Sequence, residues 1–257
     1  MNTGLHSING TQMYCEVRGE GVPRLLLHGF TGSSQDWKLI YPLPPEGVCL
    51  IAPDLRGHGR STNPAGVFTH RQAASDVLAL LDSLGVGTFE AIGLSAGGNT
   101  LLHMATRRPE RVRAMILVSA TTHFPDAARA LMGRVTIENR SDEEWASMRR
   151  SHKFGDVQIR ALWRQANAFR DSYDDMNFTP TMLARITART LIVHGEKDPL
   201  YPRAIADELA GGIEGSKLWI VPGGGHVPIF GETSAKFREA AAAFFAAPAG
   251  RTGEIVL

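Results

Sequence analysis

The sequence predicts an α/β protein: a mostly parallel sheet of eight strands with helices on both faces and a small helical cap inserted after the sixth strand. Two patterns lead to this prediction. Short continuous apolar runs alternate with longer segments whose apolar residues recur at helical spacing. Runs that are apolar on both faces are typical of parallel strands covered by helices. The 257 residues suffice for one large domain with a sizeable core.

Eight short runs are predicted strands. The first two flank Asn9-Gly10, a dipeptide typical of a tight hairpin turn, so they are expected to pair antiparallel and form one edge of the sheet. The predicted strands cover residues 5–8, 12–17, 24–27, 48–52, 89–92, 112–118, 190–193 and 217–221.

Helices are predicted between these strands. Residues 69–84 show the pattern clearly, because Ala73, Val77 and Leu80 fall on one helical face. Further helices are predicted to start near Ser34 and just after Ser95, and to cover residues 202–210 and 234–245.

The strand–helix alternation stops at about Thr122. Beyond it, Ser141 opens a capping box, residues 157–169 are amphipathic, and Thr179-Pro180 marks the start of a short helix. No strand is predicted between Thr122 and Arg189. We therefore expect residues 122–186 to form a helical cap on a core domain made of residues 1–121 and 187–257.

The composition favours a cytoplasmic protein with no nucleic-acid or membrane partner. The net charge is +1 with both signs interspersed, and no apolar run approaches the ~20 residues of a membrane helix. The N-terminal residues lack a signal-peptide pattern. Cys15 and Cys49 fall in predicted strands, as buried thiols rather than a disulfide framework. A monomer or a homodimer is compatible with these features.

Ser95 is the predicted nucleophile. It lies at the centre of Gly93-Leu94-Ser95-Ala96-Gly97, between a buried strand and a helix. This arrangement is a nucleophile elbow, a tight strand-to-helix turn that exposes the serine hydroxyl. The helix that begins after Ser95 directs its unpaired N–H groups and positive dipole end towards any negative charge that develops there.

A serine nucleophile needs a base and an acid that orients the base. His226 is the predicted base, because it lies just past the last strand in a loop of three glycines and two prolines. Asp198 follows the preceding strand and is favoured as the acid over its neighbour Glu196. We interpret His28, His58, His103 and His194 as structural.

Two backbone amides are expected to stabilise the oxyanion. One is the N–H of Ala96, directly after the nucleophile. The other is the N–H of Phe30, in the loop after the third strand. Aromatic residues of the cap predict an apolar pocket beside these amides, and we expect it to be lined by Phe30, Leu94, Trp145, Trp163 and Val227.

With these residues identified, the chain resembles the α/β-hydrolase superfamily over essentially its whole length. The resemblance rests on five motifs in the family order: His28-Gly29-Phe30, residues 54–61, residues 93–98, the Asp198 loop and the His226 loop. It implies an α/β-hydrolase fold with Ser95 as nucleophile, His226 as base and Asp198 as orienting acid. Family members with an aspartate nucleophile are excluded by the serine at position 95.

The resemblance implies a serine hydrolase that cleaves carboxylic esters with small to medium acyl chains through an acyl-enzyme. Carbon–carbon bond hydrolases and perhydrolases are similar to the chain in the loop of residues 57–61 and in the compact helical cap, and a lyase of the menaquinone pathway is similar in residues 28–37. The lyase would need a basic residue in the pocket, for which Arg56 is the candidate. The alternative from another class is a non-catalytic ligand receptor on this fold. No cofactor is implied, and no histidine or cysteine cluster has metal-ligand spacing.

Overall fold

The computed structural model describes residues 2–247. Within them, eight strands form one sheet in the order β1-β2-β4-β3-β5-β6-β7-β8. Neighbouring strands from β4 to β8 pair in parallel, whereas β2 pairs antiparallel with both β1 and β4. The strands are β1 (Gly4–Ile8), β2 (Thr11–Arg18), β3 (Val22–Leu27), β4 (Val48–Pro53), β5 (Phe89–Leu94), β6 (Val112–Val118), β7 (Arg189–Gly195) and β8 (Lys217–Val221).

The predicted hairpin forms the edge of the sheet. Asn9 and Gly10 both adopt positive φ, at 46° and 75°, which is the backbone of a tight turn between paired strands. Ile8 and Thr11 face each other directly across this turn. The Asn9-Gly10 turn therefore sets the register between β1 and β2 at the antiparallel edge.

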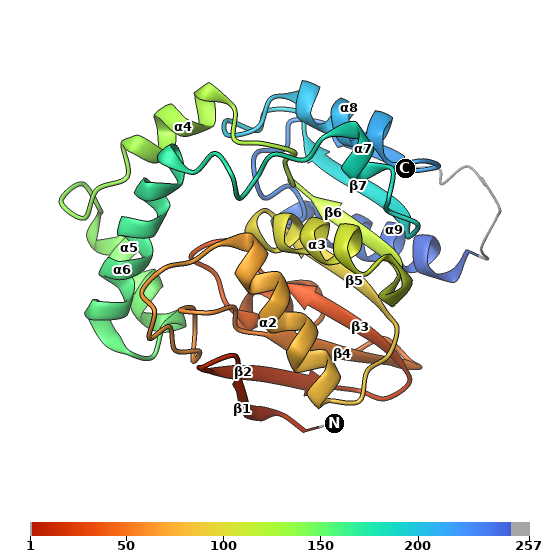
Figure 1. Cartoon of the computed structure of the whole chain (residues 1–257), viewed down its shortest axis with the longest axis horizontal. Helices are drawn as coiled ribbons and strands as arrows, with labels where there is room; N and C mark the ends of the chain where they lie inside the picture. The colour runs from red at the N-terminus through yellow and green to blue at the C-terminus, as the bar shows by residue number, and fades with distance from the viewer. Residues whose placement is uncertain (1, 248–257) are drawn as a thin grey trace.

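Helices cover both faces of the sheet, as predicted (Figure 1). One apolar core joins α2, α3 and α8 to the sheet, and a second joins α1 and α9 to its opposite face. The helices of these layers are α1 (Trp37–Ile40), α2 (His70–Ser83), α3 (Ala96–Arg107), α8 (Arg203–Gly212) and α9 (Ser234–Ala246). The continuous apolar strands are buried because both of their faces contact helices.

The segment between β6 and β7 is helical. It holds α4 (Asp126–Gly133), α5 (Asp142–Ser151), α6 (Gly155–Ala168) and α7 (Pro180–Leu183). Ser141 forms the predicted capping box with Glu144, and Thr179 caps α7. No sequence pattern predicted α4, whose N-cap residue Pro125 makes no side-chain cap. The division into a core and a cap of residues 122–186 remains a prediction.

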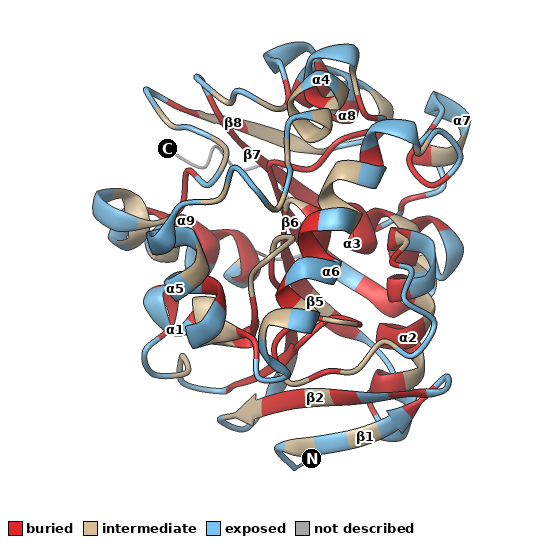
Figure 2. Ribbon diagram, turned by 90° about the vertical axis from the view of Figure 1, so that its left-hand side faces the viewer, coloured by how far each residue is buried: buried red, intermediate tan, exposed pale blue. Residues whose placement is uncertain are grey.

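Helices α4 to α6 lie together at one end of the molecule, whereas α7 lies against α8 on the body (Figure 1). Figure 2 shows that the buried residues concentrate in the central strands and that α5 and α6 expose much of their surface. Met148, Ile159, Leu162 and Trp163 form a small apolar cluster between α5 and α6, separate from the two cores of the sheet. Among residues 2–247, no helix is long and apolar enough to cross a membrane.

Candidate active site

Ser95 occupies a strained turn between β5 and α3. Its φ of 50° and ψ of −114° lie in a region that non-glycine residues rarely adopt. The turn is held because the Ser95 N–H donates to the Val118 carbonyl at 2.8 Å. Close packing explains the flanking glycines: a Cβ at Gly97 would lie 2.2 Å from the carbonyl oxygen of Leu27, and one at Gly93 would lie 2.6 Å from that of Gly97.

The structure brings Ser95, His226 and Asp198 together in one hydrogen-bonded chain. Ser95 Oγ lies 2.8 Å from His226 Nε2, and His226 Nδ1 lies 2.8 Å from Asp198 Oδ2. The carboxylate must accept from Nδ1, so a neutral His226 carries its proton on Nδ1 and presents the Nε2 lone pair to the serine hydroxyl. This tautomer is the one that a base acting on Ser95 requires.

Asp198 is held in the loop after β7. Its Oδ1 accepts the N–H groups of Leu200 and Tyr201 at 2.8 and 3.1 Å. Burial alone would raise the pKa of this carboxyl, but the hydrogen bond from His226 and those two amides bring the pKa below its usual value. Asp198 is therefore charged at neutral pH, although its side chain has no exposed surface.

Glu196 has a different role from Asp198. Its Oε2 accepts the N–H of Gly223 at 2.8 Å, which ties the loop after β7 to the loop after β8. The Lys197 N–H donates to the Gly224 carbonyl at 2.8 Å and links the same two loops. These contacts fix the backbone just before Asp198 and just before His226.

Phe30 and Ala96, whose backbone amides are the predicted oxyanion donors, line the same cavity as Ser95. Ala96 is the first residue of α3 and Phe30 follows β3. Neither amide donates to another group in residues 2–247. His28 holds the Phe30 loop: it is fully buried, its Nδ1 donates to the Gly29 carbonyl at 2.8 Å, and its Nε2 accepts the N–H of Leu55 at 2.9 Å.

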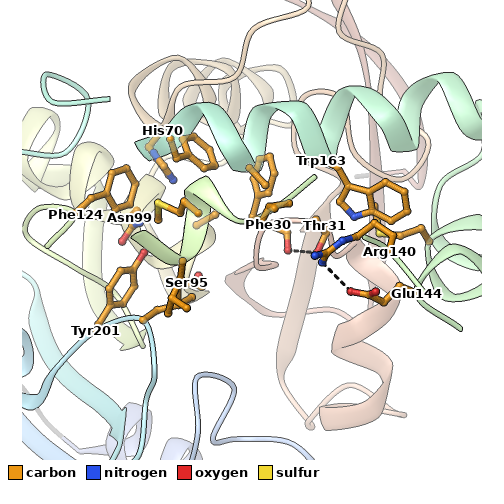
Figure 3. Close-up of a pocket in the computed structure, with 18 of the residues that line it drawn as sticks. Phe30, Thr31, His70, Ser95, Asn99, Phe124, Arg140, Glu144, Trp163 and Tyr201 are labelled. Atoms are coloured by element: carbon orange, nitrogen blue, oxygen red, sulfur yellow. Dashed lines mark hydrogen bonds and ion pairs between the residues drawn. The ribbon is translucent and has the colours of Figure 1, made fainter. Parts of the chain in front are cut away.

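The cavity above Ser95 has a volume of about 440 Å³ and lies between the sheet and helices α4 to α6. Its wall is mainly apolar, as in small-molecule sites. Figure 3 shows His70, Phe124, Asn99 and Tyr201 at one end, Trp163, Arg140 and Glu144 at the other, and Phe30 between them. Burial raises the pKa of Tyr201, whose hydroxyl shares a hydrogen bond with the Asn99 side chain.

Two of the five predicted pocket residues, Phe30 and Trp163, line this cavity. Leu94 does not, because it packs into the core on the α1 and α9 side of the sheet. Trp145 lies edge-on behind Trp163, with ring centroids 4.4 Å apart. Val227 is 51 % exposed and is not part of the cavity wall. The pocket prediction needs correcting at these three positions.

Sequence reasoning missed several lining residues that come from distant segments. Four of them carry a local signal. Asn99 follows Ser95 by four residues on α3, so it lies on the same helical face. Tyr201 lies three residues beyond Asp198, in the same loop. Leu200 lies in that loop too, and Thr31 directly follows Phe30. The remaining lining residues had no such signal: His70, Phe124, Leu131, Met132, Val135, Arg140, Glu144, Ser147, Met148, Ala166 and Phe169.

The histidines interpreted as structural are hydrogen-bonded to backbone carbonyls. His58 Nδ1 donates to Arg56 at 3.0 Å, His103 Nε2 to Asp175 at 2.7 Å and His194 Nε2 to Tyr201 at 3.0 Å. The side chain of Arg56 forms a buried ion pair with Asp76 at 2.7 Å and does not line the Ser95 cavity. In the described part of the chain, no group of three or more His, Cys, Asp or Glu is arranged to hold a metal ion.

Residues 25–240 match the sequence profile described as the alpha/beta hydrolase family. The chain belongs to this family. The match covers most of the sheet, the elbow, the helical insertion and both loops after β7 and β8. The resemblance inferred from the motifs is thereby confirmed at the level of the family, and the chain is a hydrolase.

Relatives of different specificity share this family. The human (Homo sapiens) serine hydrolase BPHL is 29 % identical over 232 residues, covering 86 % of this chain and 78 % of that protein. The 2-hydroxymuconate semialdehyde hydrolase of Pseudomonas putida is 28 % identical over 242 residues, covering 81 % and 82 %. The solved structure of the esterase EaEST from Exiguobacterium antarcticum has a TM-score of 0.77 at 26 % identity, covering 96 % of this chain and all of that one (100 %).

Proposed function

We propose that the chain is a serine hydrolase that cleaves carboxylic esters of small to medium acyl chains through an acyl-enzyme intermediate. The observation that carries this proposal is the hydrogen-bonded chain from Ser95 through His226 to Asp198, whose serine lines a cavity together with Phe30 and Ala96. The named esterase among the structural neighbours supports it.

The proposed reaction has two halves. His226 Nε2 takes the hydroxyl proton while Ser95 Oγ attacks the ester carbonyl, and the N–H groups of Phe30 and Ala96 stabilise the oxyanion. The imidazolium then gives its proton to the leaving alcohol. Water, activated by the same imidazole, cleaves the acyl-enzyme and restores Ser95. Asp198 stabilises the imidazolium and keeps its proton on Nδ1 throughout.

The size of the cavity supports small to medium acyl chains. About 440 Å³ lies at the lower end of the range for small-molecule pockets. Helices α4 to α6 cover the cavity, and Phe124 and Phe169 occupy its wall at one end. A long acyl chain would have to displace these buried rings.

Hydrolysis of p-nitrophenyl acetate, butyrate and octanoate tests the proposal. We expect the wild type to turn over acetate and butyrate faster than octanoate, and Ser95→Ala to lose at least about 10⁴-fold in kcat. Folding of the variant is checked by circular dichroism. A strong preference for octanoate contradicts the chain-length proposal. Absence of turnover by folded wild type contradicts ester hydrolysis.

Carbon–carbon bond hydrolysis is the second candidate. The Pseudomonas putida relative and Arg140 at one end of the cavity favour it, because a guanidinium can bind the carboxylate of a diketone acid. Against it, Arg140 is already paired with Glu144 at 2.8 Å and with Asn139 at 2.7 Å. Turnover of a vinylogous diketone acid but not of esters would favour this candidate, and Arg140→Met should then raise KM for that acid alone.

The remaining alternatives have less support. Arg56 is paired with Asp76 away from the cavity, so it does not supply the basic residue that the lyase alternative needs. A perhydrolase would use the same serine, and peroxide-dependent formation of a peracid would identify it. A non-catalytic receptor has no need for a complete serine–histidine–carboxylate chain, and the ester assay separates it from the hydrolases.

A further inference from the structure

A second histidine–aspartate pair lies in the wall of the Ser95 cavity. His70 is the first residue of α2, and its Nδ1 is 2.7 Å from Asp175 Oδ2. Asp175 belongs to the segment between α6 and α7, so residues more than one hundred positions apart form this pair. His70 is 1 % exposed and Asp175 is 7 % exposed. The proposed ester hydrolysis assigns no role to either residue.

Asp175 is fixed from several sides. Besides the His70 ring, its carboxylate accepts the N–H groups of His70 and Arg71 at 2.7 and 3.1 Å, at the start of α2. Burial alone would raise the pKa of Asp175, but these hydrogen bonds lower it to about 2. The carboxylate is therefore charged and acts only as an acceptor, which requires His70 Nδ1 to donate.

The other ring nitrogen of His70 is left for a ligand. With the proton of the neutral ring on Nδ1, Nε2 carries a lone pair. Nε2 has no hydrogen-bond partner among residues 2–247, and it is not one of the fully enclosed unpartnered atoms. His28 and His152 differ from His70, because both ring nitrogens of each are hydrogen-bonded within the protein. His70 lines the cavity beside Phe124 (Figure 3).

Aromatic rings surround the His70 side chain. The ring stacks on Phe169, with centroids 5.3 Å apart, and lies 5.4 and 5.9 Å from Phe68 and Phe124. Nearby, the Asn99 side chain is occupied by the Thr121 N–H and the Tyr201 hydroxyl. A free acceptor in a mainly apolar wall discriminates between ligands with and without a matching donor.

We propose that His70, oriented by Asp175, recognises a hydroxyl or amine donor on the substrate, so that the preferred ester carries such a group at the His70 end of the pocket. This inference rests on the proposed ester hydrolysis and narrows its substrate class. His70 is assigned to recognition, not to the reacting atoms. A mainly structural role would make His70 necessary for folding but would give no preference between matched substrates.

Matched esters test the proposal. The probes are p-nitrophenyl butanoate against 3-hydroxybutanoate, and hexanoate against 6-hydroxyhexanoate, since two chain lengths sample different depths of the cavity. For each pair, kcat/KM of the hydroxy ester divided by that of the plain ester is measured. In His70→Phe, which keeps an aromatic ring against Phe169, we expect this ratio to fall about tenfold for at least one pair, mainly through KM. Phe124→Leu is the matched control and should leave the ratio within about twofold.

The ratio separates recognition from structural damage, because a loss of folded enzyme lowers both rates of a pair equally. Asp175→Asn should lower the ratio less than His70→Phe does, because the amide can donate to Nδ1 and move the ring proton to Nε2, which a substrate hydroxyl can still meet as an acceptor. An unchanged ratio in His70→Phe for both pairs overturns the proposal while ester hydrolysis stands. p-Nitrophenyl 5-oxohexanoate, whose keto group accepts but cannot donate, is compared with hexanoate in the same way, and a fall of this ratio alone overturns the proposal because Nε2 would then be a donor.

Calorimetric titration covers the case in which the wild type cleaves no ester. Ser95→Ala and Ser95→Ala/His70→Phe are titrated with the same four intact esters. We expect the second substitution to weaken binding of a hydroxy ester about tenfold more than that of its plain partner. Equal weakening of both partners overturns the recognition role independently of turnover.

Discussion

His226 Nε2 lies 2.8 Å from the hydroxyl oxygen of Ser95, although the two residues are 131 positions apart in the chain. Each is fixed by its own loop: Ser95 by the strained turn after β5, and His226 by the loop after β8 that is tied to the Asp198 loop. The proposed base and nucleophile are therefore already in hydrogen-bond contact without a ligand, which is the geometry that nucleophilic catalysis requires.

Asp198→Asn should lower kcat for p-nitrophenyl butyrate by about 10³–10⁴-fold with little change in KM, because an amide next to Nδ1 favours the wrong tautomer of His226. Glu196→Gln is the matched control two residues away. The amide oxygen of Gln can still accept the Gly223 N–H that ties the two loops, and this side chain does not contact His226, so kcat should stay within about threefold. Equal losses in the two variants would contradict the assignment of the acid.

His152 should act as a positioning residue for the Phe30 amide. Its Nε2 donates to the Thr31 carbonyl at 3.0 Å and its Nδ1 accepts the Gly59 N–H at 2.9 Å, so it connects the end of α5 to two loops of the core. We expect His152→Phe to lower kcat by about tenfold to a hundredfold through misplacement of the Phe30 amide, and His152→Gln to recover part of it. A change confined to KM would argue against this role. The exposed His123→Ala serves as control.

The stability of the protein should fall as the pH falls from about 6.5 to about 4. Burial lowers the pKa of His103 and of His152 to about 4, from an ordinary value of 6.5. In this window the unfolded chain binds protons that the folded chain does not, so the free energy of unfolding decreases as the pH is lowered. Each histidine accounts for a loss on the order of 3 kcal/mol.

Urea denaturation at a series of pH values measures this effect. Above pH 6.5 and below about 4, these two histidines do not change the free energy of unfolding with pH, because the folded and the unfolded chain then bind the same number of protons. Between these pH values, His103→Gln should reduce the slope of the free energy of unfolding against pH by the amount that corresponds to about one proton. A wild-type stability that is constant from pH 6.5 to 4 would contradict the burial argument.

Gly97→Ala should destabilise the fold by about 3 kcal/mol or more and abolish activity, because the new methyl group would meet the Leu27 carbonyl oxygen at 2.2 Å. Gly211→Ala is the control. Gly211 lies in α8 with no atom within 4 Å of a new Cβ, so this substitution should leave the stability unchanged or raise it by up to about 1 kcal/mol. Thermal unfolding of the two variants compares them directly.

The sheet could be predicted from the sequence because its signals are local. Asn9-Gly10 predicted the hairpin, and uninterrupted apolar runs predicted the buried strands. Ser95, Asp198 and His226 could be singled out for the same reason, since each lies in a loop after a strand and such loops meet at one edge of a parallel sheet. The structure shows these three residues in contact.

The pocket could not be predicted in the same way. Leu94 is adjacent to Ser95 in sequence, but neighbouring residues of a strand point to opposite faces of the sheet, so it belongs to the core. Trp145 is as aromatic as Trp163 but packs edge-on against it, outside the cavity wall, with the guanidinium groups of Arg149 and Arg160 5.1 and 4.9 Å from its ring centroid. His70 faces the cavity only because α2 begins beside Asp175, a long-range contact that no local pattern indicates.

Trapping of the acyl-enzyme tests the central claim most directly. Wild type and Ser95→Ala are mixed with p-nitrophenyl acetate, quenched with acid in the first turnovers, digested with a protease and analysed by mass spectrometry. We predict one acetyl group on the wild-type peptide that contains Ser95, and none on the corresponding peptide of Ser95→Ala. Ester turnover without that label, or with the label on another residue in both proteins, would contradict the assignment of Ser95 as the nucleophile.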